Sequence, residues 1–219
     1  MKRFILVIIV IVLFSCNSTQ LIETWKNPEV TTYEPSKVLV VGLTSNLEAR
    51  RNFENQLKSE LQLRGIEAIS SLEIFKPEKM TENDLKTLEN NLIDSGFDTI
   101  LFSKIIGVED KIVYKKNYDG YDETYSKFRE DYLKYQDVYY NPDYYNEYTV
   151  YHAETALYCI CPTKDRSLLW KGYIDIVEPE SAERTITNYV NLVILALEQE
   201  QLINPELLIN DPIDDELIN

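Results

Sequence analysis

The chain has 219 residues and a formal net charge of −15, from 22 basic and 37 acidic side chains. Such an acidic surface repels phosphates and anionic lipid headgroups, so the charge excludes a nucleic-acid-binding protein. Three cysteines do not make a disulfide framework, and the length suits one domain with a substantial core.

The N-terminus begins with a basic pair, Lys2 and Arg3, followed by an unbroken apolar run of eleven residues from 4 to 14. As a helix this run would be about 17 Å long, too short for a hydrocarbon core of about 30 Å. It therefore predicts a signal peptide over residues 1–15 and not a transmembrane helix.

The run ends in Leu13-Phe14-Ser15-Cys16. This sequence resembles the lipobox of bacterial lipoproteins, which implies cleavage before Cys16, a diacylglyceryl thioether on its sulfur and an acyl chain, such as palmitate, on its amine. The alternative is an ordinary secretory signal that ends near a cysteine. Two or more acyl chains anchor a protein stably, at about 0.8 kcal/mol for each buried methylene. We expect a membrane-anchored lipoprotein, and Asn17 favours the outer membrane, facing the periplasm.

Removal of residues 1–15 takes away Lys2 and Arg3 and leaves 204 residues with a charge of −17. The pattern then predicts a lipidated cysteine and polar tether over 16–30 and a single α/β domain over 31–202. A β-α-β-α-β order in its first half predicts a parallel sheet with right-handed crossovers. The expected elements are a strand at 37–43, a helix opened by a capping box at 45–48, a strand at 66–70, a helix from Thr81 and a strand at 98–106.

The second half predicts antiparallel strands, with one running back at 110–116 and a hairpin of 148–161 and 168–177. Along the last strand Trp170 and its even-numbered neighbours share one face, while Lys171, Tyr173 and Asp175 share the other. We expect the second face to be wetter. A terminal helix follows Pro179, and the acidic tail over 203–219 is expected to be mostly disordered.

Twelve of the 16 tyrosines lie between 114 and 151, within a tyrosine-rich insertion at 118–148. Aromatic residues recur at alternating intervals of three and four, which predicts a helix over about 121–140 with one aromatic face. An irregular excursion is the alternative, because tyrosine is an indifferent helix former. We expect that face either to pack on the domain or to form a binding surface for a partner or glycan, composed of Tyr121, Tyr125, Phe128, Tyr132, Tyr135 and Tyr139.

Candidate catalytic groups do not converge in the sequence. His152 and Cys159 would lie about 23 Å apart on opposite faces of one strand, which argues against a Cys-His dyad or a zinc site. Cys159 and Cys161 share a strand face at about 6.6 Å and are typical of small core residues, with a redox pair as the alternative. The turn at 41–46 lacks the glycine pattern of a phosphate loop. We expect no catalytic residue, metal or cofactor.

Several segments resemble a group of uncharacterised bacterial lipoproteins of the Bacteroidetes type. The resemblance is carried by TWKNPE, KVLVVGL, RRNFENQL and GIEAISS near the beginning of the chain and by ETALY and LLWKGYIDI near its end. It implies an α/β domain similar to the N-terminal domain of TolB and to the curli-secretion lipoprotein. It implies no catalytic residue, since that group has no established activity.

These observations predict a non-catalytic lipoprotein that acts by binding within a periplasmic or outer-membrane assembly. We expect contact with the membrane through the lipid on Cys16, an envelope protein as partner and no nucleic acid. The alternative is a small-ligand or glycan-binding module that uses the tyrosine-rich segment.

Overall fold

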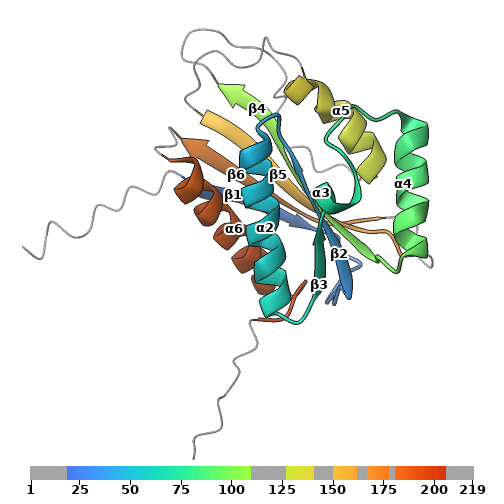
Figure 1. The fold of residues 1–219 in the computed structure, drawn as a ribbon. Helices are drawn as coiled ribbons and strands as arrows, with labels where there is room; N and C mark the ends of the chain where they lie inside the picture. The colour runs from blue at the N-terminus through green and yellow to red at the C-terminus, as the bar shows by residue number, and fades with distance from the viewer. Residues whose placement is uncertain (1–18, 110–126, 141–149, 162–166, 178–180, 206–219) are drawn as a thin grey trace, which may run out of the picture.

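The computed structural model describes residues 19–109, 127–140, 150–161, 167–177 and 181–205. They form a six-stranded mixed sheet with helices on both faces, so the predicted α/β fold class is confirmed (Figure 1). The elements in chain order are β1 (Thr19–Lys26), β2 (Lys37–Leu43), α2 (Leu47–Leu63), β3 (Glu67–Ser70), α3 (Ser71–Ile74), α4 (Glu82–Asp94), β4 (Thr99–Glu109), α5 (Phe128–Tyr140), β5 (Val150–Cys159), β6 (Leu168–Val177) and α6 (Ala182–Gln199).

The strand order β1-β6-β5-β4-β2-β3 divides the sheet into a parallel and an antiparallel half. β2 is parallel to both of its neighbours, while β4, β5, β6 and β1 pair antiparallel in turn. From β2 the chain passes through α2 to β3 and then through α4 to β4, on the other side of β2. The carboxyl ends of β2 and β4 therefore form a topological switch point, where open α/β sheets usually bind ligands.

The two helices that connect the parallel strands begin at polar caps. The Asn46 side chain accepts hydrogen bonds from the backbone N–H groups of Glu48 at 3.1 Å and Ala49 at 3.0 Å. The capping box predicted at 45–48 is therefore wrong: the cap is Asn46, one residue later, and Ala49 at the third helical position has no side chain that could complete a capping box. Thr81 caps α4 in a true capping box, as the predicted helix start requires.

The helices cover the two faces of the sheet in pairs (Figure 1). α2 and α6 lie side by side on one, here called the α2–α6 face, and α4 and α5 cover the other, the α4–α5 face. The core of the α2–α6 face contains Trp170, which is fully buried over Gly172. A Cβ on Gly172 would lie 2.4 Å from the Trp170 ring, so this position requires glycine.

β1 corrects the prediction that residues 16–30 form a polar tether. Thr19–Lys26 pair with β6, with Thr19 opposite Ile176 and Lys26 opposite Trp170. The segment joins the sheet because it covers the free hydrogen-bonding edge of β6 and its apolar residues contribute to both cores. The predicted tether is therefore wrong for 19–26.

The expected wet face of β6 is also wrong. Lys171 and Tyr173 are 4% and 1% exposed, because this side of the strand belongs to the α4–α5 face and Lys171 pairs with a buried acid there. The alternation of side chains along β6 correctly assigned them to two faces of the sheet. It did not reveal that helices would cover both faces.

The predicted start of α5 and the predicted start of the C-terminal tail differ from the structure. Other predicted segments fall on residues that the structure does not describe. α5 begins at Phe128 rather than near 121, and 121–126 lie outside the described residues, as does the strand expected at 110–116. Ile203, assigned above to the tail, is 4% exposed and packs in the core of the α2–α6 face. Residues 206–219 lie outside the described part of the chain.

Candidate functional site

A pocket of about 220 Å³ lies on the α2–α6 face at the switch point. It is bounded by the end of β2, the first turns of α2 and α6, and the facing residues of β4, β5 and β6. Its side chains are mainly apolar, and those of Ala49, Tyr151 and Ile186 are half-buried. The pocket is therefore open to solvent at the ends of the two helices.

The two helices that form the pocket are joined away from it. The Arg64 guanidinium, just after α2, binds Glu198 near the end of α6 at 2.7 Å. Closer to the pocket, Phe53 and Tyr189 pack edge to face with ring centroids 5.8 Å apart. These contacts tie the helices together at their middles and carboxyl ends, and the pocket lies between their first turns.

A chain of three hydroxyl groups lies at the base of the pocket. Ser103 and Tyr189 line it, and Thr155, fully buried behind them, is 2.7 Å from the Ser103 hydroxyl and 2.8 Å from that of Tyr189. Burial raises the pKa of Tyr189 well above its ordinary value of 10.0, so its hydroxyl stays neutral. Each hydroxyl thus has a partner within the protein.

The pocket is uncharged, although Lys104 contributes to its wall. Ser103 and Lys104 are neighbours in β4, so their side chains point to opposite faces of the sheet. The Lys104 ammonium pairs with Glu154 and with Asp131 of α5 on the α4–α5 face. Among the described residues that line the pocket, none places an ionised group inside it.

The end of β2 and the turn after it, weighed above as a phosphate site, form one wall of the pocket. The backbone N–H of Gly42 donates to Glu54 Oε1 at 2.9 Å, and Asn46 caps the helix that follows. The Gly42 N–H and the first N–H groups of α2 are therefore engaged within the protein.

The Glu54 carboxylate belongs to a buried ion pair that was not predicted from the sequence. Arg50 and Glu54, both fully buried in α2, are joined by a bond of 2.8 Å from Arg50 Nε. Ser71 donates to Glu54 at 2.7 Å and accepts from Arg50, which connects α2 to α3. The signal was present, because both residues fall on the apolar stripe of α2 with Phe53 and Leu57.

A second buried cluster lies on the α4–α5 face and was also missed. Lys104 and Lys171 both approach Glu154, the latter at 3.6 Å, and Tyr158 donates to Asp131. The four charged residues are each at most 5% exposed. These groups neutralise one another under α5, so the cluster is a structural network rather than a solvent-accessible site.

His152 and the two cysteines lie on separate parts of the sheet. His152 Nδ1 is 2.7 Å from Asp175 Oδ1 across the β5–β6 pair, on the α4–α5 face. Cys159, at the other end of β5, packs with the core of the α2–α6 face. Within the described residues, no three candidate ligands of His, Cys, Asp and Glu form a metal-binding group.

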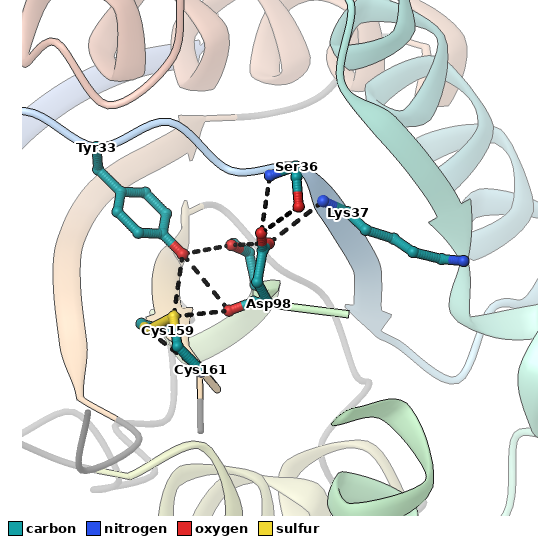
Figure 2. Close-up of a disulfide and its surroundings, with 7 residues drawn as sticks. Tyr33, Ser36, Lys37, Asp98, Cys159 and Cys161 are labelled. Carbon is teal, nitrogen blue, oxygen red and sulfur yellow. Dashed lines mark hydrogen bonds between the residues drawn. A yellow bond between two sulfur atoms is a disulfide. The ribbon is translucent and has the colours of Figure 1, made fainter. Parts of the chain in front are cut away.

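Cys159 and Cys161 form a disulfide, and both pack with the core of the α2–α6 face, as expected for small core residues. Their Cα atoms are 5.4 Å apart, closer than an extended strand would place them, because β5 ends at Cys159 and the chain bends beyond it. Figure 2 shows the disulfide beside Tyr33 and Asp98. The Tyr33 hydroxyl is hydrogen-bonded to the Thr99 hydroxyl at 2.7 Å. Burial raises the pKa of Tyr33 to about 12.

The aromatic stripe of the tyrosine-rich segment faces the core where its side chains are described. Phe128 and Tyr132 are 2% and 0% exposed and pack against Phe102. The prediction that Phe128 and Tyr132 belong to an exposed binding surface is therefore wrong. Both side chains are buried because α5 covers the apolar α4–α5 face of the sheet. Tyr121 and Tyr125 lie outside the described residues, as do the side chains of the two members nearest the end of α5, Tyr135 and Tyr139.

The predicted lipidation site, Cys16, also lies outside the described residues, three positions before the first residue of β1. In the part of the chain that the structure describes, no helix has the length and apolar character needed to span a membrane.

Comparisons with known proteins give a distant structural likeness. No protein-family model matches the sequence, and no curated protein matches it. One similar solved structure is the PelC dodecamer from Paraburkholderia phytofirmans, with 9% identity and a TM-score of 0.42 over 84% of this chain and 98% of that one. A second is the dodecamer of a PelC point variant from the same organism, with 10% identity and a TM-score of 0.39 over 84% and 97%.

Proposed function

We propose that this protein is a non-catalytic lipoprotein, anchored through lipid on Cys16, which acts by binding within a periplasmic or outer-membrane assembly. The observation that carries the proposal is the sequence Leu13-Phe14-Ser15-Cys16 after a basic pair and eleven apolar residues. A charge of −17 on the mature chain keeps the domain away from anionic headgroups, so the covalent lipid supplies the attachment.

Support for a non-catalytic role comes from the reactive side chains, which are engaged in structural contacts. The two cysteines near the end of β5 are bonded to each other, and His152 is held by Asp175. The buried acids Glu54 and Glu154 each pair with a buried base. None of these groups faces the pocket together with a second reactive group.

A second candidate function is small-ligand binding, and the pocket at the switch point is the observation in its favour. The tyrosine-rich segment was the predicted location of such a site, but its residues Phe128 and Tyr132 are buried in the core of the α4–α5 face. The uncharged pocket on the opposite face is the better location for a ligand.

Replacement of Cys16 tests the anchor. We expect Cys16→Ala to move the protein from the membrane fraction to the soluble fraction and to abolish the mass added by lipid. The matched control is Cys161→Ala, which removes a cysteine of the disulfide and should leave the protein in the membrane fraction. Retention of the Cys16→Ala protein in the membrane would refute the proposal.

A further inference from the structure

We propose that the pocket on the α2–α6 face binds one acyl chain of the lipid on Cys16 of the same molecule. The inference rests on the proposed lipidation and assigns a binding partner to the pocket. Its basis is the size and chemistry of the pocket together with the place where the described chain begins.

The pocket has the size of a short apolar segment. An apolar cavity of about 150 Å³ holds benzene, so a space of about 220 Å³ suits a somewhat larger hydrocarbon group. Side chains of Phe53, Ile176 and Ile186 supply apolar walls, and Ala49 leaves room at the entrance. These walls fit the end of an aliphatic chain.

The polar groups of the pocket do not require a polar ligand. Thr155 already bonds the hydroxyls of Ser103 and Tyr189, so a hydrocarbon laid on these two groups leaves neither of them without a partner. The ammonium of Lys104 is held on the opposite face of the sheet. An uncharged apolar chain therefore enters without a desolvation penalty from these groups.

The N-terminus brings the lipid close to this pocket. Thr19, the first described residue, lies opposite Ile176, a wall residue, and directly opposed residues share a face of the sheet. The three residues from Cys16 to Thr19 span at most about 11 Å. Adding about 5 Å across the strand pair places Cys16 within roughly 16 Å of Ile176.

An acyl chain covers nearly all of this distance at its largest, and all of it at any closer approach of Cys16. Half of a hydrocarbon core of about 30 Å is the depth of one leaflet, so an acyl chain reaches roughly 15 Å. Covalent attachment also gives the chain on Cys16 a high effective concentration at the pocket compared with a free lipid. With three acyl chains on Cys16, one in the pocket leaves two for the membrane, enough for stable anchoring.

A photo-crosslinking experiment tests the occupant directly. p-Benzoylphenylalanine replaces Thr185, a half-buried wall residue in the first turn of α6, in the full-length protein in its native membrane. After irradiation, mass spectrometry should find the peptide with residue 185 joined to the lipopeptide of Cys16. The matched control is the same replacement at Leu195, which is 49% exposed on α6 and should give no such product. Crosslinks at position 185 only to free phospholipids, or none at all, would overturn the proposal.

A binding experiment tests the pocket without the lipid. The chain from residue 16 onward with Cys16→Ser keeps every described residue and should bind 1-decanol in calorimetry. Ala49→Phe should weaken this binding at least about tenfold, the equivalent of roughly two buried methylenes. Asn52→Phe adds the same ring on the exposed side of α2 and should leave the binding unchanged. Absence of binding, or equal binding by both variants, would overturn the assignment of the pocket.

The two experiments separate failure of this inference from failure of the proposed function. The mass of the Cys16 peptide reports lipidation by itself, before irradiation. A lipidated peptide without the intramolecular crosslink contradicts the inference alone, whereas an unmodified Cys16 contradicts the proposed function.

Discussion

Two adjacent residue pairs of the β4–β5 ladder give opposite environments on the two faces of the sheet. Ser103 lies opposite Thr155 and faces the pocket, while Lys104 lies opposite Glu154 and faces α5. The first pair is neutral and the second is ionic, yet both are buried. Successive side chains of a strand point to opposite faces of the sheet. The helices on the two faces therefore pack against different residues, even where those residues are neighbours in the chain.

The difference shows that the two faces of the sheet bury their polar groups in different ways. On the α4–α5 face, charges neutralise one another and aromatic rings of α5 fill the remaining space. On the α2–α6 face, hydroxyl groups satisfy one another and leave an open apolar pocket beside them. The same face also buries the Arg50–Glu54 ion pair, so the neutral environment is local to the pocket. This pocket is where we propose that an apolar ligand binds.

The largest expected effect comes from breaking the ionic pair. Glu154→Ala leaves Lys104 and Lys171 buried with too little negative charge, and we expect a loss of about 3–5 kcal/mol in the free energy of unfolding. Urea denaturation measures the loss. The control is Glu67→Ala, which removes a 59% exposed partner of Lys37 and should cost about 0–1 kcal/mol. Equal losses of stability for Glu154→Ala and Glu67→Ala would contradict the burial of the Lys104, Lys171 and Glu154 cluster.

Removal of an aromatic ring from α5 tests the filling of the same face. Phe128→Ala should cost about 3 kcal/mol, because the ring occupies space between Phe102 and Tyr158. Thermal or urea unfolding measures it. Leu195→Ala, at a 49% exposed position, should cost less than about 1 kcal/mol. A loss for Phe128→Ala no larger than that of the control would contradict a buried aromatic stripe.

The smallest expected effect concerns the hydroxyl chain of the pocket. Tyr189→Phe removes one hydrogen bond to Thr155, which still bonds Ser103, so we expect a loss of about 1 kcal/mol at neutral pH. The folded-state pKa of Tyr189 is raised above 10.0, so the folded protein keeps this proton while the unfolded chain loses it above that pH. The stability due to Tyr189 therefore falls as pH rises above 10.

The difference in unfolding free energy between Tyr189→Phe and the parent protein should accordingly shrink from about pH 9 to about pH 11, measured by urea denaturation at each pH. A difference that stays constant over this interval would contradict burial of the Tyr189 hydroxyl.

Most of the fold followed from local patterns. Continuous apolar runs such as 37–43 predicted the buried parallel strands, and the capping signal at Thr81 predicted the start of α4. β1 escaped prediction because a strand at the edge of a sheet needs only one partner and carries mixed polarity. The start of α5 was placed too early because periodicity continues through residues 121–126, which lie outside the described part of the chain.

The amino-acid sequence by itself determined the α/β class and most of the order of strands and helices, and it contains the pattern on which the proposed lipid attachment at Cys16 rests, since each depends on residues close together in the chain. Tertiary structure decided what distant residues do together: the Arg50–Glu54 pair with α3, the Lys104 cluster, the disulfide and the pocket. These depend on strand register and helix placement, which bring residues from β4, β5 and α6 into contact. Tertiary structure also decided which way the aromatic stripe faces, because the packing of α5 on the sheet directs Phe128 and Tyr132 into the core.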